Sequence, residues 1–286
     1  MQTLDRLALR NWPLPPADDA SDKEDRGQVL IVAGSREIPG AAILAATAAL
    51  RAGAGKLAIA TDQSVALGLA LVMPEARVIA LPETPAGGLL PSGASLLEEC
   101  AARSSAVLIG PGLLDGASSC EFVLALLQCL KGVPVILDAL AMDVLLRKPR
   151  FDEPVLLTPH VGEMAHLTGS SKDSIVADAP DAAREMASRS NAVVALKGAT
   201  TFIVSPQGNS WCHVSATPGL GTSGSGDVLA GVMTGFAARG ASLEQAAAWG
   251  VVVHALAGKR LADRHGRLGF LARELLMEIP SVMRHM

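Results

Sequence analysis

Short apolar runs alternate with longer stretches of helical periodicity along most of this chain. Each run consists mainly of Val, Ile, Leu and Ala, without the polar alternation of a half-exposed strand. The runs lie at residues 29–33, 57–60, 106–109, 133–137 and 155–158. Strands that are apolar throughout are typical of a parallel sheet covered by helices on both faces. With helices expected at 41–51 and 119–131, the pattern predicts β-α-β units and an α/β fold.

The rhythm changes in the last third of the chain. Three further apolar runs lie at 192–197, 201–204 and 210–214. The polar segment 206–209 separates the last two runs and contains Pro and Gly. Two strands joined by so short a turn predict an antiparallel hairpin, which we expect at the sheet edge. Two helices, near 228–238 and 243–264, are expected to close the domain.

The N-terminal residues differ in composition from the rest. Residues 12–16 read Trp-Pro-Leu-Pro-Pro, and the stretch from Asp18 to Asp25 is rich in charge. Segments that are rich in proline and charge seldom form a packed core. We therefore expect a surface arm at 1–27 and a single domain at 28–286, with regular structure beginning at Gln28.

The composition fits one large α/β domain and limits its partners. The chain has 286 residues, 50% of them hydrophobic, and a formal net charge of -4. Its basic residues are scattered, so we expect no nucleic-acid partner. Gly, Pro or charged residues interrupt every apolar stretch before the roughly 18 residues that a membrane-spanning helix needs, so we expect no membrane segment.

The cysteines indicate a reducing compartment. None of them forms a C-x-x-C pair, and no secretory leader precedes them. They are Cys100, Cys120, Cys129 and Cys212. We interpret them as reduced thiols and expect a cytoplasmic protein.

The segment 217–231, TPGLGTSGSGDVLAG, carries the most informative chemistry. Its glycines let the backbone approach an anion, and the helix that follows directs free N–H groups to the same place. Gly224, Ser225 and Gly226 are therefore the expected phosphate site. Asp227 would repel a phosphate unless it takes a proton from a bound hydroxyl, so it is the candidate catalytic base. The alternative is that Ser225 or Asp227 only caps the helix.

Other motifs follow the predicted strands. In chain order they are Gly34-Ser35, Gly110-Pro111-Gly112, Asp138, the segment 158–163 and the segment 197–201. Ligands of open α/β sheets bind at the carboxyl ends of the strands, so we expect these motifs to meet in one crevice. Each glycine motif taken alone is equally well explained by a turn.

Histidine and lysine positions leave alternatives. His160 and Glu163 lie three residues apart like a pair of metal ligands, but no further ligand has a suitable spacing, so zinc is not expected. Lys197 is either a surface lysine or, with the glycine after it, part of a loop over a nucleotide. Other histidines are interpreted as solvated or satisfied by neighbours, among them His166, His213 and His254.

Together these motifs resemble one family from Gln28 onward. The matching segments are 34–35, 39–42, 48–55, 109–113, 158–160, 162–164, 196–200 and 224–231. The chain resembles the ADP-dependent NAD(P)H-hydrate dehydratases, carbohydrate-kinase-like members of the ribokinase superfamily. Gly-Ser-Gly-Asp at 224–227 separates this family from sugar kinases, which typically have Gly-Ala-Gly-Asp. The resemblance implies a ribokinase-like three-layer α/β/α sandwich, with a mostly parallel central sheet and an antiparallel edge hairpin.

The resemblance also implies a reaction. Family members return the S epimer of the 6-hydroxylated hydrates NADHX and NADPHX to NADH and NADPH at the expense of ADP, and release AMP and phosphate. Phosphate is a better leaving group than hydroxide, which explains a dehydratase on a kinase scaffold. Magnesium is implied through the nucleotide phosphates, and no protein residue is assigned as its ligand. The family further implies a homo-oligomer, a tetramer by analogy, and a functional link to a separate NAD(P)HX epimerase.

The family's functional residues map onto defined positions. Asp227 would activate the hydrate hydroxyl, and the backbone N–H groups of 224–226 would hold the charge that develops during phosphoryl transfer. The positions that match hydrate contacts are Ala41, Gly112, His160 and Asp227. The positions that match AMP contacts are Lys197, Gly198, Ala199, Thr200, Thr201 and Gly226.

Three positions depart from the family pattern. Val161 replaces a Pro, Ser223 replaces a Gly, and Leu140 replaces the second Asp of Asp-Ala-Asp-Ala-Leu. If that Asp positions magnesium or substrate, Leu140 implies slower turnover or an altered substrate. Two alternatives remain open at this point: a small-molecule hydroxyl kinase of the same superfamily, and a non-catalytic nucleotide-binding relative. The intact segment 224–227 argues against the second, because a sensor needs no base.

Overall fold

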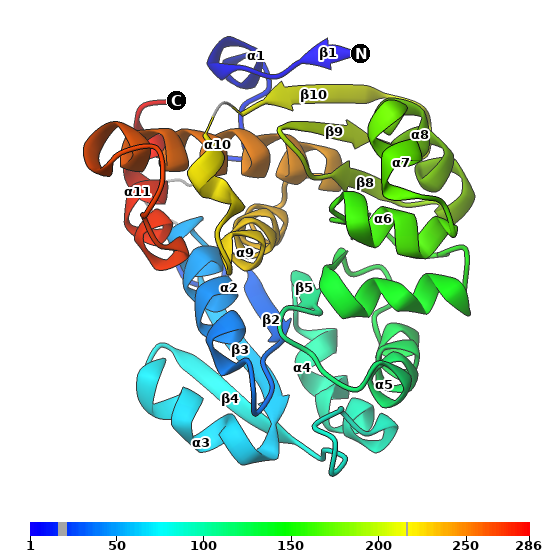
Figure 1. Ribbon diagram of the computed structural model, residues 1–286. Coiled ribbons are helices and arrows are strands. Elements are labelled where there is room, and N and C mark those ends of the chain that lie inside the picture. The colour runs from blue at the N-terminus through cyan, green and yellow to red at the C-terminus, as the bar shows by residue number, and fades with distance from the viewer. Residues whose placement is uncertain (17–21, 216) are drawn as a thin grey trace.

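One sheet organises the molecule. The computed structural model describes residues 1–16, 22–215 and 217–286, and within them ten strands pair in the order β1-β10-β9-β8-β7-β6-β5-β2-β3-β4 (Figure 1). Their bounds are β1 (Gln2–Thr3), β2 (Gln28–Val32), β3 (Lys56–Asp62), β4 (Ala76–Leu81), β5 (Ala106–Ile109), β6 (Val135–Leu137), β7 (Val155–Leu157), β8 (Val193–Leu196), β9 (Thr200–Val204) and β10 (Ser210–Val214). Pairing is parallel from β4 to β8, whereas β9 is antiparallel to both β8 and β10.

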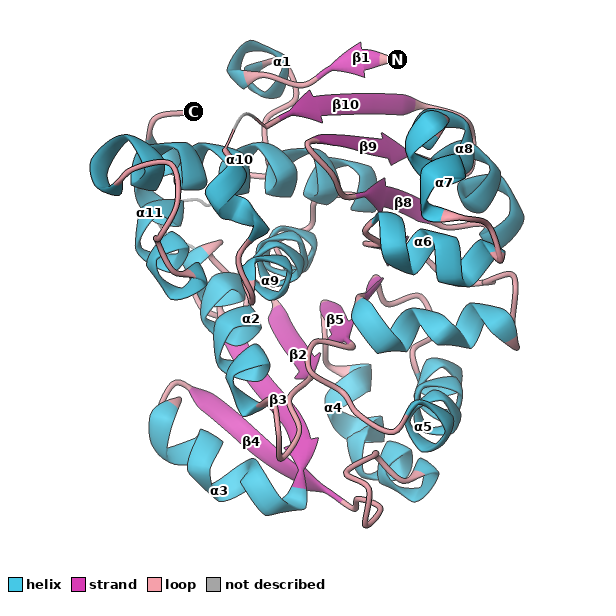
Figure 2. Cartoon of the chain, viewed as in Figure 1, coloured by secondary structure: helices cyan, strands magenta, loops and turns pink. Residues whose placement is uncertain are grey.

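Helices cover both faces of this sheet (Figure 2). One face carries α2 (Pro39–Arg51), α3 (Gln63–Val72), α9 (Ser225–Ala238), α10 (Leu243–His265) and α11 (Ala272–Arg284). The other carries η1 (Pro91–Leu97), α4 (Glu98–Ala102), α5 (Gly116–Cys129), η2 (Ala139–Leu146), α6 (Val161–Thr168), α7 (Lys172–Ala177) and α8 (Ala179–Ser190). The short helices α1 (Arg6–Arg10) and η3 (Pro218–Gly221) complete the chain. Each face buries its own apolar cluster, so the predicted α/β/α sandwich is confirmed.

Small residues bring α2 and α9 into close contact. A Cβ atom added to Gly231 would lie 2.2 Å from the carbonyl oxygen of Ala45, and one added to Gly235 would lie 2.5 Å from that of Ala49. Larger side chains would force the helices apart. This register makes the two helices run in the same direction. Because α2 begins just beyond the carboxyl end of β2, the N-terminus of α9 is carried to the same edge of the sheet.

The N-terminal residues pack onto the domain, contrary to the predicted surface arm. β1 pairs with β10, and the side chains of Leu4 and Leu9 are buried. The indole N–H of Trp249 donates to the carbonyl oxygen of Trp12 at 2.8 Å. Apolar side chains between the prolines provide this packing, which a count of prolines and charges overlooks. Of the charged stretch that begins at Asp18, residues 18–21 lie outside the described part of the chain.

The element pattern agrees with the predicted one and adds to it. The hairpin of β9 and β10 forms, but β1 lies outside it, so the hairpin is not the sheet edge. The pattern does not predict α3, β4, α7, α8 or α11. α11 contains Pro280, a residue that ordinarily ends a helix, and β4 is an edge strand whose apolar run at 78–81 is only partly buried. No helix among the described residues has the length and apolar character to cross a bilayer.

Candidate active site at the carboxyl edge of the sheet

Loops from three strands meet at the carboxyl edge of the sheet. The N–H of Gly34, after β2, donates to the carbonyl oxygen of Pro111, after β5, at 2.8 Å. Gly110 has a φ of +131°, and a Cβ atom there would lie 1.7 Å from the carbonyl oxygen of Asp138, after β6. Only glycine fits such a position. These loops are therefore in direct contact, but Gly34, Gly110 and Asp138 are not among the residues that line the cleft beside them.

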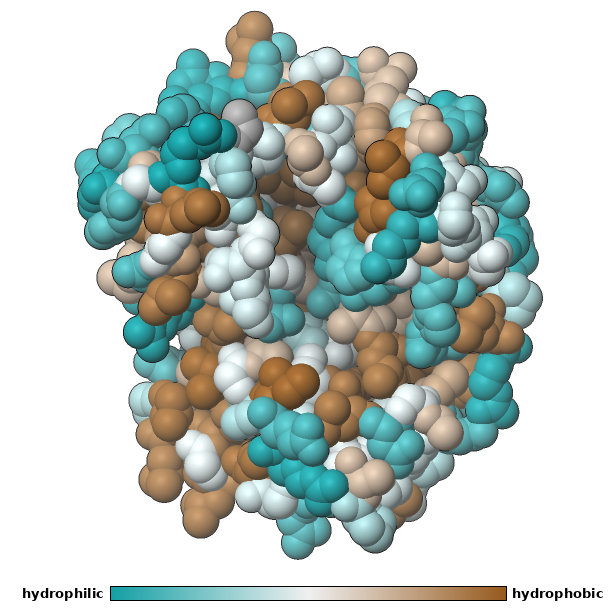
Figure 3. All heavy atoms as spheres, in the orientation of Figure 1, coloured by the Kyte–Doolittle hydropathy of each residue, from teal (hydrophilic) through white to brown (hydrophobic). Residues whose placement is uncertain are grey.

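A cleft of about 810 Å³ opens beside these loops. Its walls are the turn between β8 and β9, η3, the start of α9 and the middle of α10, and Figure 3 shows the hollow between the η3 segment and that turn. The lining includes most of the residues that the sequence assigns to nucleotide or phosphate. They are Lys197, Gly198, Ala199, Thr201, Ser225 and Gly226. Thr200 begins β9 next to them.

Lys197 is the centre of an ionic network at this cleft. Its Nζ donates to Oδ1 of Asp138 at 2.9 Å and lies 4.0 Å from Oε2 of Glu163. The Thr158 hydroxyl donates to the same Asp138 oxygen at 2.6 Å. Burial by itself would lower the pKa of Lys197, but the negative charges of Asp138 and Glu163 outweigh this effect and raise it. The ammonium group is therefore charged and held in place, as phosphate binding requires.

Asp227 lies in the first turn of α9, close to this network. Burial raises the pKa of Asp227 to about 6; the negative charge of Asp138 adds to the rise and Lys197 opposes it. A carboxylate in this state takes up a proton more readily than an exposed one. The N-cap of α9 is Gly224, with φ +86°, and no side chain in the described structure caps this helix. The capping alternative for Asp227 and Ser225 is therefore wrong.

Ala41 and Gly112, two positions that match hydrate contacts, lie against each other. Gly112 has a φ of +69°, and a Cβ atom there would lie 2.7 Å from the Cβ of Ala41 and 2.8 Å from the carbonyl oxygen of Ile38. The fold thus joins the start of α2 to the loop after β5. Ala41 is buried, and neither residue lines the cleft.

The pair of His160 and Glu163 is a helix start. The Glu163 N–H donates to Nδ1 of His160 at 3.0 Å, and the His160 N–H donates to Oε2 of Glu163 at 2.7 Å, a capping box at the N-terminus of α6. Helix capping explains the spacing that resembles a metal pair. In the part of the chain that the structure describes, no group of three or more His, Cys, Asp and Glu side chains could hold a metal ion. The His160 side chain remains 58% exposed at the cleft.

The other histidines have neighbours as predicted, with one outcome that the sequence did not foresee. His166 lies 3.2 Å from Asp143, and Nδ1 of His213 lies 2.8 Å from the carbonyl oxygen of Leu4. His254 is buried in α10, and its partner is a residue of the phosphate loop: Nε2 lies 3.0 Å from the hydroxyl oxygen of Ser225, which also lines the cleft. A local sequence pattern cannot predict this contact, because Ser225 and His254 lie on different helices.

Leu140 lies in η2, two residues after Asp138. Its side chain is half-buried against the apolar cluster of the second face, and its Cδ1 lies 3.8 Å from the place of a Cβ atom on Gly116. The position that carries a carboxylate in the family pattern thus contributes apolar packing to the start of α5.

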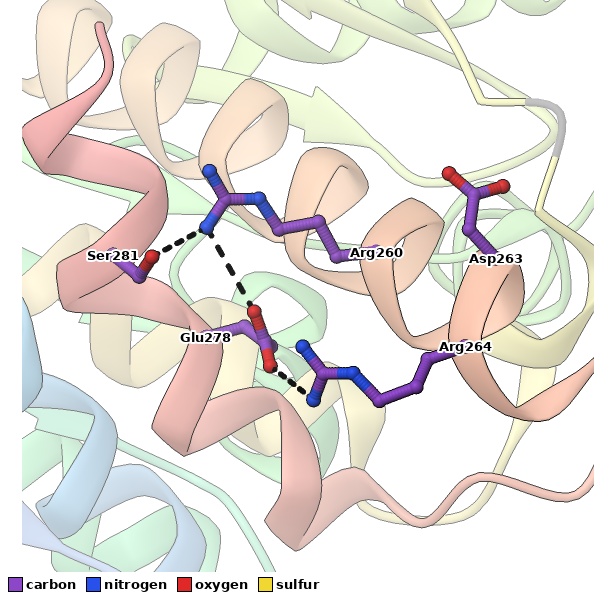
Figure 4. Close-up of a pocket in the computed structure, with 5 residues that line it drawn as sticks. All are labelled: Arg260, Asp263, Arg264, Glu278 and Ser281. Carbon is purple, nitrogen blue, oxygen red and sulfur yellow. Dashed lines mark hydrogen bonds and ion pairs between the residues drawn. The ribbon is translucent and has the colours of Figure 1, made fainter.

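A second hollow lies between α10 and α11 and differs in character (Figure 4). Arg264 donates to Oε1 of Glu278 at 2.9 Å, and Arg260 donates to the Ser281 hydroxyl at 2.7 Å and lies 3.8 Å from Oε2 of Glu278. These charges satisfy one another and tie the two helices together. The cleft at the strand ends, with its glycine loops and its Lys197 network, is therefore the candidate active site.

Comparison with known proteins agrees with this geometry. A family model described as NAD(P)H-hydrate dehydratase matches residues 29–281. The chain belongs to this family. It is 47% identical over 284 residues to an ADP-dependent (S)-NAD(P)H-hydrate dehydratase of Xanthomonas campestris, and the match covers 99% of this chain and 96% of that protein.

Solved structures extend the NAD(P)H-hydrate dehydratase relationship to the fold. An ADP/ATP-dependent NAD(P)H-hydrate dehydratase from Bacillus subtilis, co-crystallized with ATP and Mg²⁺, superposes with a TM-score of 0.81 at 32% identity, over 95% of this chain and 94% of that one. A ribokinase-like superfamily protein from Enterococcus faecalis superposes with a TM-score of 0.81 at 24% identity, over 95% of this chain and 92% of that one. The ribokinase-like fold that the resemblance implies is confirmed.

Proposed function

We propose that this chain is an enzyme that dehydrates the S epimer of NADHX and NADPHX to NADH and NADPH, with ADP as phosphoryl donor and AMP and phosphate as products. The observation that carries the proposal is Asp227, a partly buried carboxyl with a pKa of about 6 in the first turn of a helix that begins in a glycine-rich loop. A base and an anion site at one helix start suit phosphoryl transfer to a hydroxyl. The dehydratase relatives support the substrate class.

The nucleotide would lie in the cleft along the turn between β8 and β9. Lys197 and the residues after it line that wall, and Gly226 lies opposite: a Cβ atom added to Gly226 would lie 3.5 Å from Nζ of Lys197. The absent side chain leaves this space for a phosphate next to the ammonium group. In this proposal AMP contacts Lys197, Gly198, Ala199, Thr200, Thr201 and Gly226.

The hydrate would lie where the loops after β2, β5 and β7 meet. Ala41 and Gly112 pack against each other there without a bulky side chain, and His160 has an exposed imidazole at the same edge. Asp227 would face the hydroxyl of the hydrate. The S epimer then presents this hydroxyl to Asp227 on one side and to the terminal phosphate of ADP on the other.

The reaction follows in two steps. Asp227 takes the hydroxyl proton while the oxygen attacks the terminal phosphorus of ADP; the new O–P bond forms and AMP leaves with the electron pair of the old one. Lys197 and the N–H groups of Gly224 and Gly226 stabilise the charge on the phosphoryl oxygens. The C–O bond then breaks, phosphate leaves with its electron pair, the neighbouring carbon loses a proton to water, and the electron pair of that C–H bond restores the ring double bond.

Magnesium fits this site mainly through the nucleotide. Oδ1 of Asp138 already accepts hydrogen bonds from Lys197 and Thr158, so this oxygen is engaged within the protein. Asp138 and Asp227 are the carboxylates that would face the ion. The ADP phosphates would supply the ligands that do not come from the protein. When bound, magnesium would neutralise phosphate charge.

We further propose a cytoplasmic homo-oligomer that works beside a separate epimerase. All four cysteines are free, which suits a reducing compartment. α3 exposes Leu67 and Leu71 by 75% and 77% and Val72 by 59%, and Figure 3 shows apolar atoms in this lower left region. An apolar helix face of this kind favours contact with a second copy. The mass in solution tests the expected tetramer.

One assay tests the proposed function. The purified protein is incubated with S-NADHX, ADP and magnesium, and reduced-nicotinamide absorbance, AMP and phosphate are followed together. We expect the three products in equal amounts. A stable phosphorylated product without recovery of absorbance would instead identify a hydroxyl kinase, and absence of all three with intact ADP binding would identify a non-catalytic relative.

A further inference from the structure

Ser225 and His254 form a buried polar pair inside the cleft. Ser225 is the first residue of α9 and is 4% exposed, and His254 lies in the middle of α10 and is 8% exposed. Nε2 of the imidazole lies 3.0 Å from the Ser225 hydroxyl oxygen, and both residues line the cleft together with Lys197 and Gly226. A polar pair so well buried between two helices is costly unless it has a defined hydrogen-bond role.

The Ser225 hydroxyl is the group with which this residue can reach an anion. The backbone N–H of Ser225 already donates to the carbonyl oxygen of Thr222 at 3.2 Å. The hydroxyl lies at the N-terminus of α9, where the helix dipole favours negative charge. Whether it donates to a phosphate or only accepts depends on where its single proton points.

His254 decides the direction of that proton. Burial lowers the pKa of His254 to about 4, so the ring is neutral and carries one N–H. If the proton is on Nε2, the ring donates to Ser225, and the serine hydroxyl is free to donate into the cleft. If the proton is on Nδ1, the serine must donate to Nε2 and turns lone pairs toward the phosphate, which repels them.

We propose that His254 is a positioning residue for phosphoryl transfer: its Nε2–H donates to Ser225 and directs the Ser225 hydroxyl proton to the terminal phosphate of a nucleoside diphosphate bound at the start of α9. This inference rests on the proposed function. AMP lacks the terminal phosphate, so the pair serves ADP and the transferred group and not the AMP portion.

Four variants test the assignment. His254→Gln keeps an amide N–H near the place of Nε2, whereas His254→Leu removes it, Ser225→Ala removes the hydroxyl, and the fourth variant combines the last two. We expect His254→Gln to keep most of the activity. His254→Leu and Ser225→Ala should each lower kcat by about 10- to 100-fold, the value of one hydrogen bond to a charged group. The double variant should lose no more than either single variant, and AMP affinity should not change.

Controls separate positioning from structural support. His166→Leu changes a histidine that pairs with Asp143 on the surface, and its kcat should equal that of the parent. If the losses of His254→Leu and Ser225→Ala multiply in the double variant, or if AMP affinity falls with them, His254 only supports the fold and the inference is wrong. Recovery of activity in His254→Gln is the result that a packing role does not predict.

A spectroscopic measurement tests the inference independently of turnover. Nitrogen NMR of the ¹⁵N-histidine-labelled protein reports which ring nitrogen of His254 carries the proton, with inorganic phosphate and with ADP as probes. We expect the Nε2–H form in both. The Nδ1–H form would overturn the inference even if the dehydratase reaction is confirmed. If the parent protein binds ADP in the Nε2–H form but does not repair the hydrate, the proposed reaction fails while the positioning role stands.

Discussion

The ammonium group of Lys197 donates a hydrogen bond to Asp138 at 2.9 Å and makes none with nearby Asp227. With Lys197 bound to Asp138, Asp227 has no hydrogen-bonded counter-ion within the described structure. Burial and the charge of Asp138 therefore raise the pKa of Asp227 to about 6. The fold uses one carboxylate to hold the lysine and leaves the other without a hydrogen-bonded cation, as the proposed base role requires.

Replacement of Asp227 by Asn is the first test of this arrangement. The change keeps the size of the side chain and removes proton acceptance, so kcat should fall by about 10²- to 10⁴-fold while AMP affinity is kept. Because burial disfavours the Asp227 charge, the melting temperature at neutral pH should be unchanged or higher. Asp173→Asn, at an exposed site in α7, is the matched control and should behave like the parent. Near-normal turnover of a folded Asp227→Asn variant would rule out the base assignment.

The pH profile provides a second test. Only deprotonated Asp227 can accept the hydroxyl proton, so kcat/KM should fall about tenfold per pH unit below the pKa of Asp227. The acidic limb of the pH profile should therefore begin near pH 6. In Asp138→Asn the limb should move to lower pH, because one negative charge is lost and Lys197 is freed to act on Asp227. A limb that stays at the same pH in this variant would mean that another group titrates.

Leu140→Asp tests the departure from the family pattern. A carboxylate at this place would add negative charge beside Asp138 and favour the binding of magnesium. It should change AMP affinity little, because in the proposal the backbone of glycine-rich loops holds AMP. We expect the magnesium concentration for half-maximal rate to fall by about fivefold, the value of roughly 1 kcal/mol of added ion pairing. Leu140→Asn, without the charge, is the control. An unchanged magnesium dependence in Leu140→Asp would show that the apolar residue is neutral for the reaction.

The choice of donor follows from the position of the AMP site. If Lys197 and the turn after it hold AMP, the second phosphate of ADP is the one that reaches the start of α9. The terminal phosphate of ATP would lie one phosphate farther away. We therefore expect a higher kcat/KM with ADP than with ATP at equal magnesium. A steady-state comparison in which ATP is the better donor would contradict this placement of the nucleotide.

Asp62 gives a prediction for stability away from the cleft. Its side chain is fully buried at the end of β3, one carboxyl oxygen has no partner within the described structure, and burial with the charge of Glu83 raises the pKa of Asp62 to about 6. The folded state therefore holds this proton more tightly than the unfolded chain, and the stabilisation is lost as pH rises from about 4 through 6.

Removing the Asp62 charge should reverse that loss. Asp62→Asn should raise the free energy of unfolding above pH 6 by on the order of 1 kcal/mol. The gain should vanish below pH 4, where Asp62 of the parent protein is as neutral as the Asn of the variant. Glu83→Gln should act in the same direction, because it removes the charge that adds to the shift. Denaturant unfolding at pH 4 and pH 8 measures both; a gain that does not depend on pH would exclude titration of Asp62 as the cause.

The sequence by itself determined the elements that depend on local pattern. Apolar runs predicted the central strands, and the glycine-rich segment before α9 predicted an anion site with Asp227 at its end. Such features depend on residues close together in the chain, where backbone freedom and periodicity act directly. The same reasoning overlooked α11, because Pro280 inside it is a signal against a helix.

Only the tertiary structure decided the partners. Lys197 and Asp138 meet because β6 and β8 flank β7 in one parallel sheet, and Ser225 and His254 meet because α9 packs against α10. The packing of Leu4 likewise depends on a surface that the rest of the chain forms. Whether a carboxylate binds a lysine, like Asp138, or stays without such a partner, like Asp227, depends on its burial and its neighbours. Long-range packing determines both.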